Sequence, residues 1–388
     1  MADVNLRWNG IDLDQIFLKN DEGHLISAYL TSGNIYTWGD NENGIFGNNA
    51  TTDRSSPVQV GTQNDWVSIA TGTSNSIIAL KENGTIWSWG GNEYGQLGQN
   101  DIINRSSPVQ LGTDTNWKNV AMGQQQTFAI KTDGTLWGWG ENIQGGGLGL
   151  NDRIDRSSPV QVGTQTNWKY ISAGEFYTLA IKTDGTLWAW GYNFSGNLGL
   201  NDRIYRSSPV QVGTDTNWKH IIAAGQTSVA VKSDGGLWSW GSSSNYGLLG
   251  QNLSSSTFRS SPVQIGTQTT WNRVFGSQGN RIYVIKNDGS LWTWGQNLFG
   301  QLGLNDRISR SSPIQVGTNT NWKKIYCGIS STVALKTDGS LWSWGFNSSG
   351  ELGLNDTIDR SSPVQVGTNT NWRDLPISGQ SHSAAVSH

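Results

Sequence analysis

The sequence predicts an all-β fold, a seven-bladed β-propeller, and three observations carry this prediction. A Trp-x-Trp-Gly segment, with Tyr for the first Trp in one copy, recurs about every fifty residues, a period typical of repeat architectures. Four short segments of β-strand character, separated by turn residues, fill each period. The chain also starts and stops partway through a repeat, which predicts ring closure by its two ends in one blade. The last tryptophans of the seven copies are Trp38, Trp89, Trp139, Trp190, Trp240, Trp294 and Trp344.

The Trp-x-Trp segment is predicted to be the core strand of each blade. Alternate residues of a strand share a face, so Trp188 and Trp190 lie on the same one. The residue between them is small or modest in every copy, as Ala189 is, which indicates a close neighbour on the other face. A sheet covered on both faces is typical of blades that stand side by side in a ring.

The other strands follow from the turn signals within one repeat. In the fourth repeat we expect strands over 168–174, 177–182 and 187–190, and a short one at 210–213. Thr183-Asp184-Gly185 predicts a tight hairpin, because glycine takes positive φ without steric cost. The Gly- and Asn-rich stretch between the third and fourth strands is predicted to be a surface loop.

The chain divides into residues 1–24, which do not fit the repeat, and a propeller of residues 25–388. An eighth unit begins at Trp372 but lacks its Trp-x-Trp half, which the start of the chain holds. Ala28 and Ala385 both align with the middle strand of this closing blade, so one of the two segments has to lie elsewhere.

The N-terminal segment carries apolar side chains that the ring does not need for closure. We expect it to dock the propeller onto a partner, with buried contact area from these side chains. The alternative is that the segment covers the closing blade. The candidate docking residues are Ile11, Leu13, Ile16 and Phe17.

Composition excludes several classes of protein. Charged residues make up 14% of the chain, against about 25% in ordinary globular proteins, and the net charge is −3 with no basic block, so no nucleic-acid partner is expected. The only cysteine, Cys327, allows no intrachain disulfide. No apolar run approaches about 18 residues, and the first residues do not resemble a secretory signal peptide, so neither a membrane span nor secretion by that route is expected.

No catalytic constellation is readable. The four histidines share no metal-binding spacing, no Ser/His/Asp set is apparent, and no phosphate loop occurs. We therefore expect no enzyme activity, no cofactor and no metal site. The four histidines are His24, His220, His382 and His388.

Two repeated charged positions allow a functional and a structural interpretation. The arginine of Arg-Ser-Ser-Pro in each repeat either binds anions or fixes loop carbonyls and an aspartate within its blade, and the structural role is favoured. Aspartates that precede it in four repeats either bind a cation or cap the loop. One carboxylate per site is poor for calcium, which takes 6–8 oxygens, so capping is favoured. These aspartates are Asp152, Asp202, Asp306 and Asp356.

Aromatic residues at positions that differ between repeats are the candidate binding residues. Scaffold positions have to repeat, whereas contact residues need not, and large aromatic side chains dominate many protein interfaces. Rim packing within a blade is the alternative for each one. The candidates are Tyr94, Phe176, Tyr177, Tyr192, Phe194, Tyr205, Tyr246, Phe258, Phe299 and Phe346.

From Trp38 to Gly367 the repeats resemble those of the RCC1 family. The matching features are Trp-Gly, Asn-x-x-x-Gly-x-Leu-Gly as at Asn92 to Gly98 and Asn347 to Gly353, Arg-x-x-Pro, and the Asp-Gly hairpin. The resemblance implies a seven-bladed propeller. Nucleotide exchange on the small GTPase Ran, the best-known activity of that family, is not carried over, because the loops here are short and regular and no basic N-terminal tail is present.

A second resemblance covers only Val4 to Phe17, which is similar to the N-terminal segment of some tailed-phage virion proteins. Together with the low-charge, Asn/Ser/Thr/Gly-rich composition, it favours a non-enzymatic virion component that binds another virion protein or the host surface, with the virion as its location. The alternative is an intracellular, cytoplasmic protein-interaction module of the RCC1 type, acting on a small GTPase.

Overall fold

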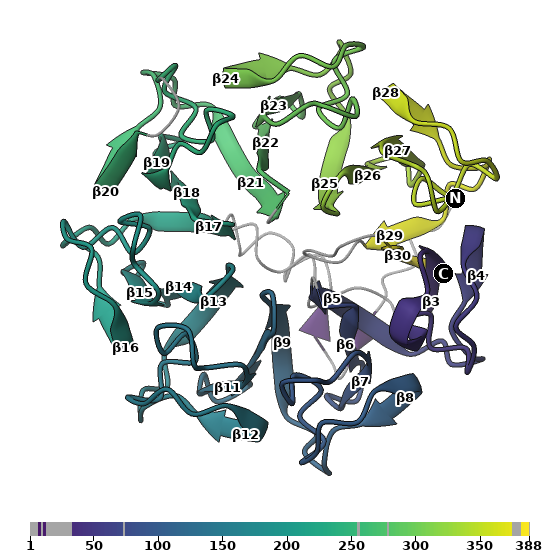
Figure 1. The fold of residues 1–388 in the computed structure, drawn as a ribbon, viewed down its shortest axis with the longest axis horizontal. Helices are drawn as coiled ribbons and strands as arrows, with labels where there is room; N and C mark the ends of the chain where they lie inside the picture. The colour runs from purple at the N-terminus through teal and green to yellow at the C-terminus, as the bar shows by residue number, and fades with distance from the viewer. Residues whose placement is uncertain are drawn as a thin grey trace.

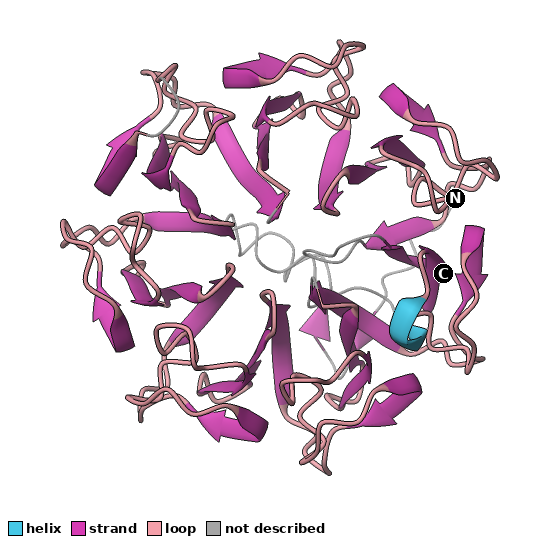
Figure 2. Ribbon diagram, in the orientation of Figure 1, coloured by secondary structure: helices cyan, strands magenta, loops and turns pink. Residues whose placement is uncertain are grey.

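The computed structural model describes residues 7–8, 11–12, 33–72, 74–253, 257–277, 279–374 and 382–387. Seven four-stranded antiparallel sheets stand around a common centre, and the seven-bladed β-propeller expected from the repeats is confirmed (Figure 1). Figure 2 shows strands and loops throughout, with one 3₁₀ helix, η1 (Glu42–Gly44), in the described part of the chain. A separate two-stranded sheet pairs β1 (Arg7–Trp8) with β2 (Ile11–Asp12).

Each blade runs from the centre outward in the order of its sheet, and we number the blades 1 to 7 (Figure 1). The innermost strands of blades 1 to 7 are β29 (Trp372–Asp374), β5 (Trp66–Gly72), β9 (Trp117–Met122), β13 (Trp168–Ala173), β17 (Trp218–Ala224), β21 (Trp271–Ser277) and β25 (Trp322–Cys327). The second strands are β30 (His382–Ser387), β6 (Ser76–Lys81), β10 (Gln126–Lys131), β14 (Tyr177–Lys182), β18 (Thr227–Lys232), β22 (Arg281–Lys286) and β26 (Ser331–Lys336).

The two outer strands of each blade hold the Trp-Gly segment and the Arg-Ser-Ser-Pro segment. The third strands are β3 (Asn34–Gly39), β7 (Ile86–Gly90), β11 (Leu136–Gly140), β15 (Leu187–Gly191), β19 (Leu237–Ser242), β23 (Leu291–Gly295) and β27 (Leu341–Gly345). The outermost strands are β4 (Arg54–Gln59), β8 (Arg105–Gln110), β12 (Arg156–Gln161), β16 (Arg206–Gln211), β20 (Phe258–Gln264), β24 (Arg310–Gln315) and β28 (Arg360–Gln365).

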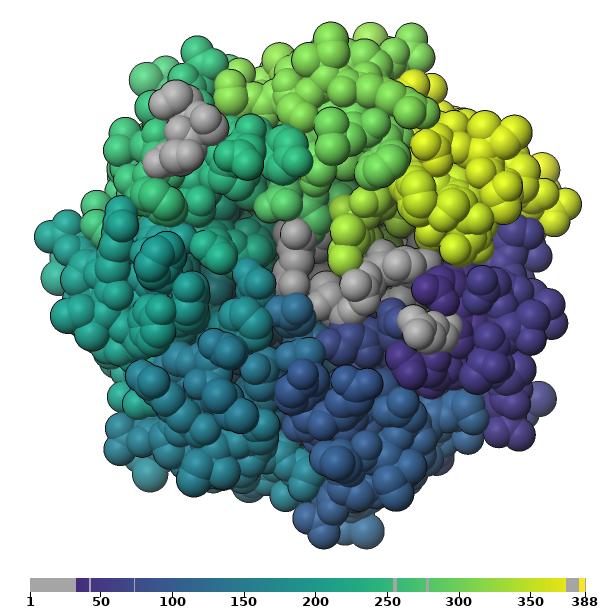
Figure 3. All heavy atoms as spheres, viewed as in Figure 1, coloured from purple at the N-terminus to yellow at the C-terminus, as the bar shows by residue number. Residues whose placement is uncertain are grey.

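Blade 1 closes the ring from both ends of the chain. β30 pairs with β3 in register, with Ile35 opposite Val386 and Trp38 opposite Ser383, and β29 completes the inner edge. The C-terminal segment with Ala385 therefore supplies the middle strand, while Ala28 lies outside the described residues. Space-filling spheres show the purple start of the ring directly beside its yellow end (Figure 3).

The hydrophobic core lies between neighbouring blades. One cluster combines Leu179 and Leu187 of blade 4 with Trp218, Ile221 and Trp240 of blade 5. All five are almost completely buried, and comparable clusters recur around the ring. Both faces of each sheet are thus covered, as expected from the small residue between the two tryptophans.

The second tryptophan of each Trp-x-Trp segment fastens its blade to the preceding one. All seven are fully buried, and each indole N–H donates a hydrogen bond of 2.8–2.9 Å to a loop carbonyl of the previous blade. Trp190, for example, donates to the carbonyl of Gly147 at 2.8 Å. Nearby Gly149 has φ +77°, and a Cβ there would lie 2.8 Å from the indole nitrogen of Trp190, so a glycine is required for this approach.

Six blades also place a lysine between two tryptophans. In blade 4, the Lys182 ammonium lies 3.5 Å from the ring centre of Trp188 and 4.9 Å from that of Trp168. Such cation–π contacts stabilise a charge that burial disfavours, and burial lowers the pKa of Lys182. Blade 1 differs, because Tyr36 stands where other blades have the first tryptophan and Ser387 stands where they have lysine.

Glu141 is a buried carboxyl group in the loop that follows β11. Only 6% of its surface is exposed, and its Oε2 accepts no hydrogen bond from the described residues. Burial and the nearby charge of Asp155 raise the pKa of Glu141 to about 7. The folded protein therefore binds this proton more tightly than the unfolded chain does.

We predict that Trp190→Ala lowers the free energy of unfolding by about 3–5 kcal/mol, because it removes a fully buried ring and its inter-blade hydrogen bond. Denaturant unfolding measures this. Phe194→Ala, at an aromatic position that is 57% exposed, is the control and should change stability by less than about 0.5 kcal/mol. Equal losses in the two variants would contradict the inter-blade role.

We predict that Glu141→Gln makes the protein more stable than wild type at pH 8 by about 1–3 kcal/mol, and by less at pH 5. The raised pKa means that the contribution of Glu141 is fully present below about pH 4.5 and is lost as the pH rises through about 7. Unfolding free energies measured from pH 5 to pH 8 test this. Parallel curves for the two proteins would show that Glu141 does not titrate in this range.

Candidate functional site

The two ends of the ring differ in their loops. One end carries the loops between first and second strands and the long loops between third and fourth strands, and we call it the long-loop face. The opposite end carries the short hairpins between second and third strands, and we call it the hairpin face. Antiparallel order places all loops of one kind at one end. Every predicted aromatic contact residue except Tyr177 belongs to the long-loop face.

Four of the predicted aromatics come together on blade 4. The ring of Tyr192 lies 4.7 Å from that of Tyr205 and 6.3 Å from those of Phe176 and Phe194. Phe176 precedes β14, and the other three lie in the loop between β15 and β16, so two loops of one blade build the group. Phe194 is 57% exposed. We call Phe176, Tyr192, Phe194 and Tyr205 the aromatic patch.

The phenol of Tyr192 stays neutral at physiological pH. Burial raises the pKa of Tyr192 to about 12, with further contributions from a hydrogen bond with Tyr205 and from the charge of Glu175. The patch therefore offers apolar ring surface together with neutral hydroxyl groups. Side chains of this amphipathic kind are enriched at the centres of protein interfaces.

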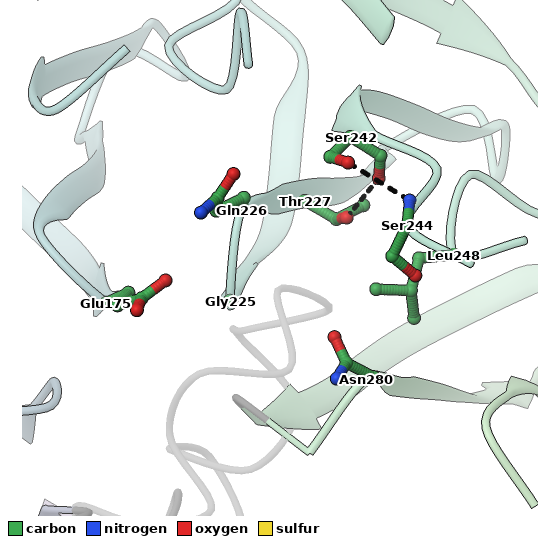
Figure 4. A pocket seen from close by; sticks show the side chains of 8 residues that line it. All are labelled: Glu175, Gly225, Gln226, Thr227, Ser242, Ser244, Leu248 and Asn280. Atoms are coloured by element: carbon green, nitrogen blue, oxygen red, sulfur yellow. Dashed lines mark hydrogen bonds between the residues drawn. The ribbon is translucent and has the colours of Figure 1, made fainter. Parts of the chain in front are cut away.

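A polar pocket of about 330 Å³ opens beside the aromatic patch, among blades 4, 5 and 6 (Figure 4). Glu175, the neighbour of Phe176, points into it from blade 4, and Gln226 and Asn280 face it from blades 5 and 6. On the blade 5 side of the pocket, the Thr227 hydroxyl at the start of β18 donates to the Ser242 carbonyl at the end of β19, at 2.5 Å. The pocket thus pairs one carboxylate with several amide and hydroxyl groups.

The remaining aromatic candidates lie apart from the patch. Phe299 and Phe346 form an edge-to-face pair, 4.9 Å apart, across blades 6 and 7. The Arg203 guanidinium stacks over Phe258 at 4.7 Å across blades 4 and 5. Tyr94 and Tyr246 are half-buried in the loops of blades 2 and 5.

The prediction that Tyr177 is a contact residue is wrong. Its ring is fully buried, and its hydroxyl donates to the Thr227 carbonyl at 2.8 Å, so it joins blade 4 to blade 5. Tyr177 starts a second strand, at a position that varies among the blades, and its side chain faces the neighbouring blade. Variation between repeats does not by itself indicate exposure.

The predicted docking residues of the N-terminal segment remain a prediction. Ile11 lies in β2, opposite Trp8, and the structure describes only its backbone. Leu13, Ile16 and Phe17 lie outside the described residues.

The structural interpretation of the repeated arginines is confirmed in five blades. Arg206 contacts the Asp202 carboxylate at 2.6 Å and donates to the Ile204 carbonyl at 2.9 Å. The same Asp202 accepts from the Asn193 amide, whose own oxygen accepts the Leu198 N–H. Equivalent arginine–aspartate pairs are Arg105–Asp101, Arg156–Asp152, Arg310–Asp306 and Arg360–Asp356.

These ion pairs and hydrogen bonds engage the carboxylates of the aspartates that the sequence offers as possible cation ligands. The backbone N–H of Ile358, together with Arg360 and Asn347, lowers the pKa of Asp356, so its carboxylate is charged and held in the loop. Within the described ranges, no three His, Cys, Asp or Glu side chains gather in a metal-binding arrangement. The described chain also has no helix long and apolar enough to cross a membrane.

A row of exposed isoleucines on the same face was not anticipated. Each precedes the loop arginine by two residues and is 62–64% exposed. The signal in the sequence is an isoleucine between polar residues of a loop, in the phrase Asp-x-Ile-x-Arg or a close variant. These residues are Ile103, Ile154, Ile204, Ile308 and Ile358.

Two solved structures superpose on this chain over most of its length. Prp20p from Saccharomyces cerevisiae superposes with a TM-score of 0.83 at 19% identity, over 95% of this chain and 94% of that chain. Human WBSCR16 superposes with a TM-score of 0.79 at 20% identity, over 92% of this chain and 99% of that one.

The curated relatives that resemble this chain include proteins of different function. The ultraviolet-B receptor UVR8 of Arabidopsis thaliana is 29% identical over 319 residues, which are 80% of this chain and 72% of the receptor. The human E3 ubiquitin-protein ligase HERC2 is 26% identical over 191 residues, which are 44% of this chain but 4% of the ligase.

Family models cover nearly the whole propeller. The model of the RCC1-like domain matches residues 10–281, and that of the regulator of chromosome condensation (RCC1) repeat matches residues 288–335 and 338–386. With its seven blades, its inter-blade tryptophans and its Asn–Asp–Arg loops, the chain belongs to the RCC1-like domain family.

Proposed function

We propose that this chain is a non-enzymatic protein-interaction module that binds its partner through the long-loop face. The observation that carries the proposal is the aromatic patch beside the polar pocket. Three aromatic rings gather around that of Tyr192, one of them 57% exposed, beside a cavity with a carboxylate and amide groups. A compact apolar centre next to satisfied polar groups is typical of interface hot spots.

Related propellers support a binding role over a virion role. The structure of Prp20p is described together with its binding to Gsp1p and histones, and another structure holds Prp20 bound to Kap60. These are properties of Prp20, and this chain resembles it in fold. The resemblance of Val4 to Phe17 to tailed-phage proteins gains no support from these proteins, and a virion location stays a prediction.

Rigid loops favour recognition by a preformed surface. The Asn193–Asp202–Arg206 network holds the loop that carries three of the four patch residues, and the Trp240 indole ties that loop to blade 5. Binding to such a surface orders few side chains, so little conformational entropy opposes it. The pocket's carboxylate, Glu175, favours a partner that presents a cationic side chain next to apolar residues.

We predict that Phe194→Asp weakens binding of the protein partner by tenfold or more, because it places a charge in the apolar centre of the interface. The partner is first isolated with the immobilised full-length chain and identified, and its affinity is then measured by calorimetry for each variant. Ile358→Asp is the matched control, since Ile358 is 63% exposed on the same face but belongs to blade 7. It should bind as wild type does.

A partner that binds Phe194→Asp normally but not Ile358→Asp would overturn the assignment of the patch. Nucleotide release from a panel of small GTPases separates simple binding from exchange activity. Acceleration by catalytic amounts of the protein would show that the module acts on a GTPase. If a GTPase binds this protein but releases its nucleotide at an unchanged rate, the result would support a module that only binds.

A further inference from the structure

The closing blade keeps the pair of aromatic rings that holds a lysine in the other six blades, but it has a serine in place of that lysine. In blades 2 to 7, tryptophans of the first and third strands meet edge-on, with ring centres 5.7–6.3 Å apart and planes at 74–84°. Blade 1 forms the same pair with Trp372 and Tyr36, at 5.4 Å and 77°. The strand register places Ser387 opposite Trp372, just as Lys182 lies opposite Trp168 in blade 4.

The six lysines show which chemical group this pair of rings accepts. Each ammonium lies 4.6–4.9 Å from the ring centre of the first-strand tryptophan. The same ammonium lies 3.5–4.5 Å from the ring centre of the third-strand tryptophan. The electron-rich faces of tryptophan and tyrosine attract cations, so the ring pair of blade 1 offers the same attraction.

The segment that enters the first strand provides hydrogen-bond acceptors near the ammonium. In three blades a carboxylate of this segment, one or three residues before the first-strand tryptophan, forms an ion pair with the lysine. Blade 1 carries Asn371 and Asn369 at these two positions, and their amide oxygens accept hydrogen bonds without a charge. The three ion pairs are Lys81–Asp65 at 3.0 Å, Lys131–Asp114 at 2.8 Å and Lys232–Asp215 at 2.8 Å.

A pocket of about 320 Å³ lies at this place, between blades 7 and 1. Tyr36, Trp372, Ser387, Asn369 and Asn371 are among the described residues that line it, and we call it the closing-blade pocket. Trp372 and Ser387 are almost completely buried, Tyr36 is half-buried and the two asparagines are exposed, so the pocket leads from solvent to the ring pair. A serine side chain ends at its hydroxyl, which leaves room for the stem and head of a lysine-like group.

We propose that the closing-blade pocket binds an alkylammonium group, the chemistry of a lysine side chain, supplied by a partner polypeptide or by a small amine. The rings of Tyr36 and Trp372 attract the charge, and the Asn369 and Asn371 oxygens accept hydrogen bonds from the ammonium. Because both asparagines are neutral, the ring faces provide most of the preference for a cation. The pocket lies between blades 7 and 1, away from the aromatic patch of blade 4, and does not depend on the function proposed for that patch.

Butylammonium is the probe, added in the millimolar range to the unmodified full chain at pH 7, and saturation-transfer NMR detects its binding. We expect transfer to butylammonium but not to 1-butanol, which has the same number of heavy atoms and no charge. Equal transfer to both compounds, or none to butylammonium, would overturn the proposal. The two sources are compared with Nα-acetyl-lysine amide. Tighter binding of this compound than of butylammonium favours a polypeptide lysine, and weaker binding favours a small amine.

Substitutions of Tyr36 test the contribution of its ring. Tyr36→Leu should weaken butylammonium binding by about tenfold, because the leucine side chain has no aromatic face to attract the cation. Tyr36→Phe is the matched control and should bind as wild type does, since it keeps the ring and removes only the hydroxyl. Equal affinities of Tyr36→Leu and wild type would show that the probe binds elsewhere.

Ser387→Lys tests the comparison with the other blades directly. The introduced ammonium should take the place that Lys182 has in blade 4 and abolish butylammonium binding. Thr164→Lys adds the same charge on an exposed residue between blades 3 and 4 and should leave binding unchanged. Retained binding in Ser387→Lys, or equal loss in both variants, would overturn the assignment of the pocket.

Discussion

The hydrogen bond from a buried indole to the preceding blade's loop is the contact on which the ring depends. A propeller has no layer above or below its sheets, so each blade is stable only while both neighbours cover it. The tryptophan at the end of the core strand fills the space between two blades and donates to a loop carbonyl, which in several blades also accepts from a hydroxyl, as the Gly147 carbonyl does from Thr178. The Trp38 indole N–H donates to the Glu351 carbonyl at 2.9 Å, so the last blade is joined to the first by the same hydrogen bond that joins the other neighbouring blades.

The inter-blade hydrogen bond of the tryptophan also determines which loop residues are exposed on the long-loop face. The carbonyl acceptor lies in the long loop of the preceding blade, so the loop cannot move without breaking the inter-blade bond. The asparagine, aspartate and arginine of the loop, such as Asn347, Asp356 and Arg360, then satisfy the remaining backbone groups. The repeated residues are thereby used for structure, and residues such as Phe194 and Tyr205 are left to differ between blades at little cost to stability.

Much of the fold was predictable because every blade has to pack against its neighbours in the same way. A tryptophan every fifty residues reports the same packing in every blade, and an Asp-Gly or Asn-Gly pair after the second strand reports the same turn in blades 2 to 7. Ring closure was predictable from the half-repeats at the two ends, but the choice between Ala28 and Ala385 was not, since both satisfy the same pattern of small apolar residues. The β30 register shows that Ala385 occupies the closing blade.

The candidate site was predictable only in part, because exposure at a variable position depends on the neighbouring blade. Phe176 and Tyr177 are adjacent in the sequence, yet one joins the aromatic patch while the other is buried between blades. Arg281, at the same place in blade 6 as Tyr177 in blade 4, is also fully buried and donates to carbonyls of blade 7. Such positions vary because each interface is filled by a different side chain, and hydrophobicity alone does not reveal them.

The distribution of positive charge also depends on residues that lie far apart in the sequence. A scan for basic blocks finds none, since Arg273, Lys323 and Arg373 are separated by fifty residues each. The repeat period brings them onto adjacent inner strands, Lys323 and Arg373 at the second position of their strands and Arg273 at the third. In a closed repeat protein, the charge pattern is therefore read across the repeats, because a chain with net charge −3 and no basic block can still place cations on neighbouring inner strands.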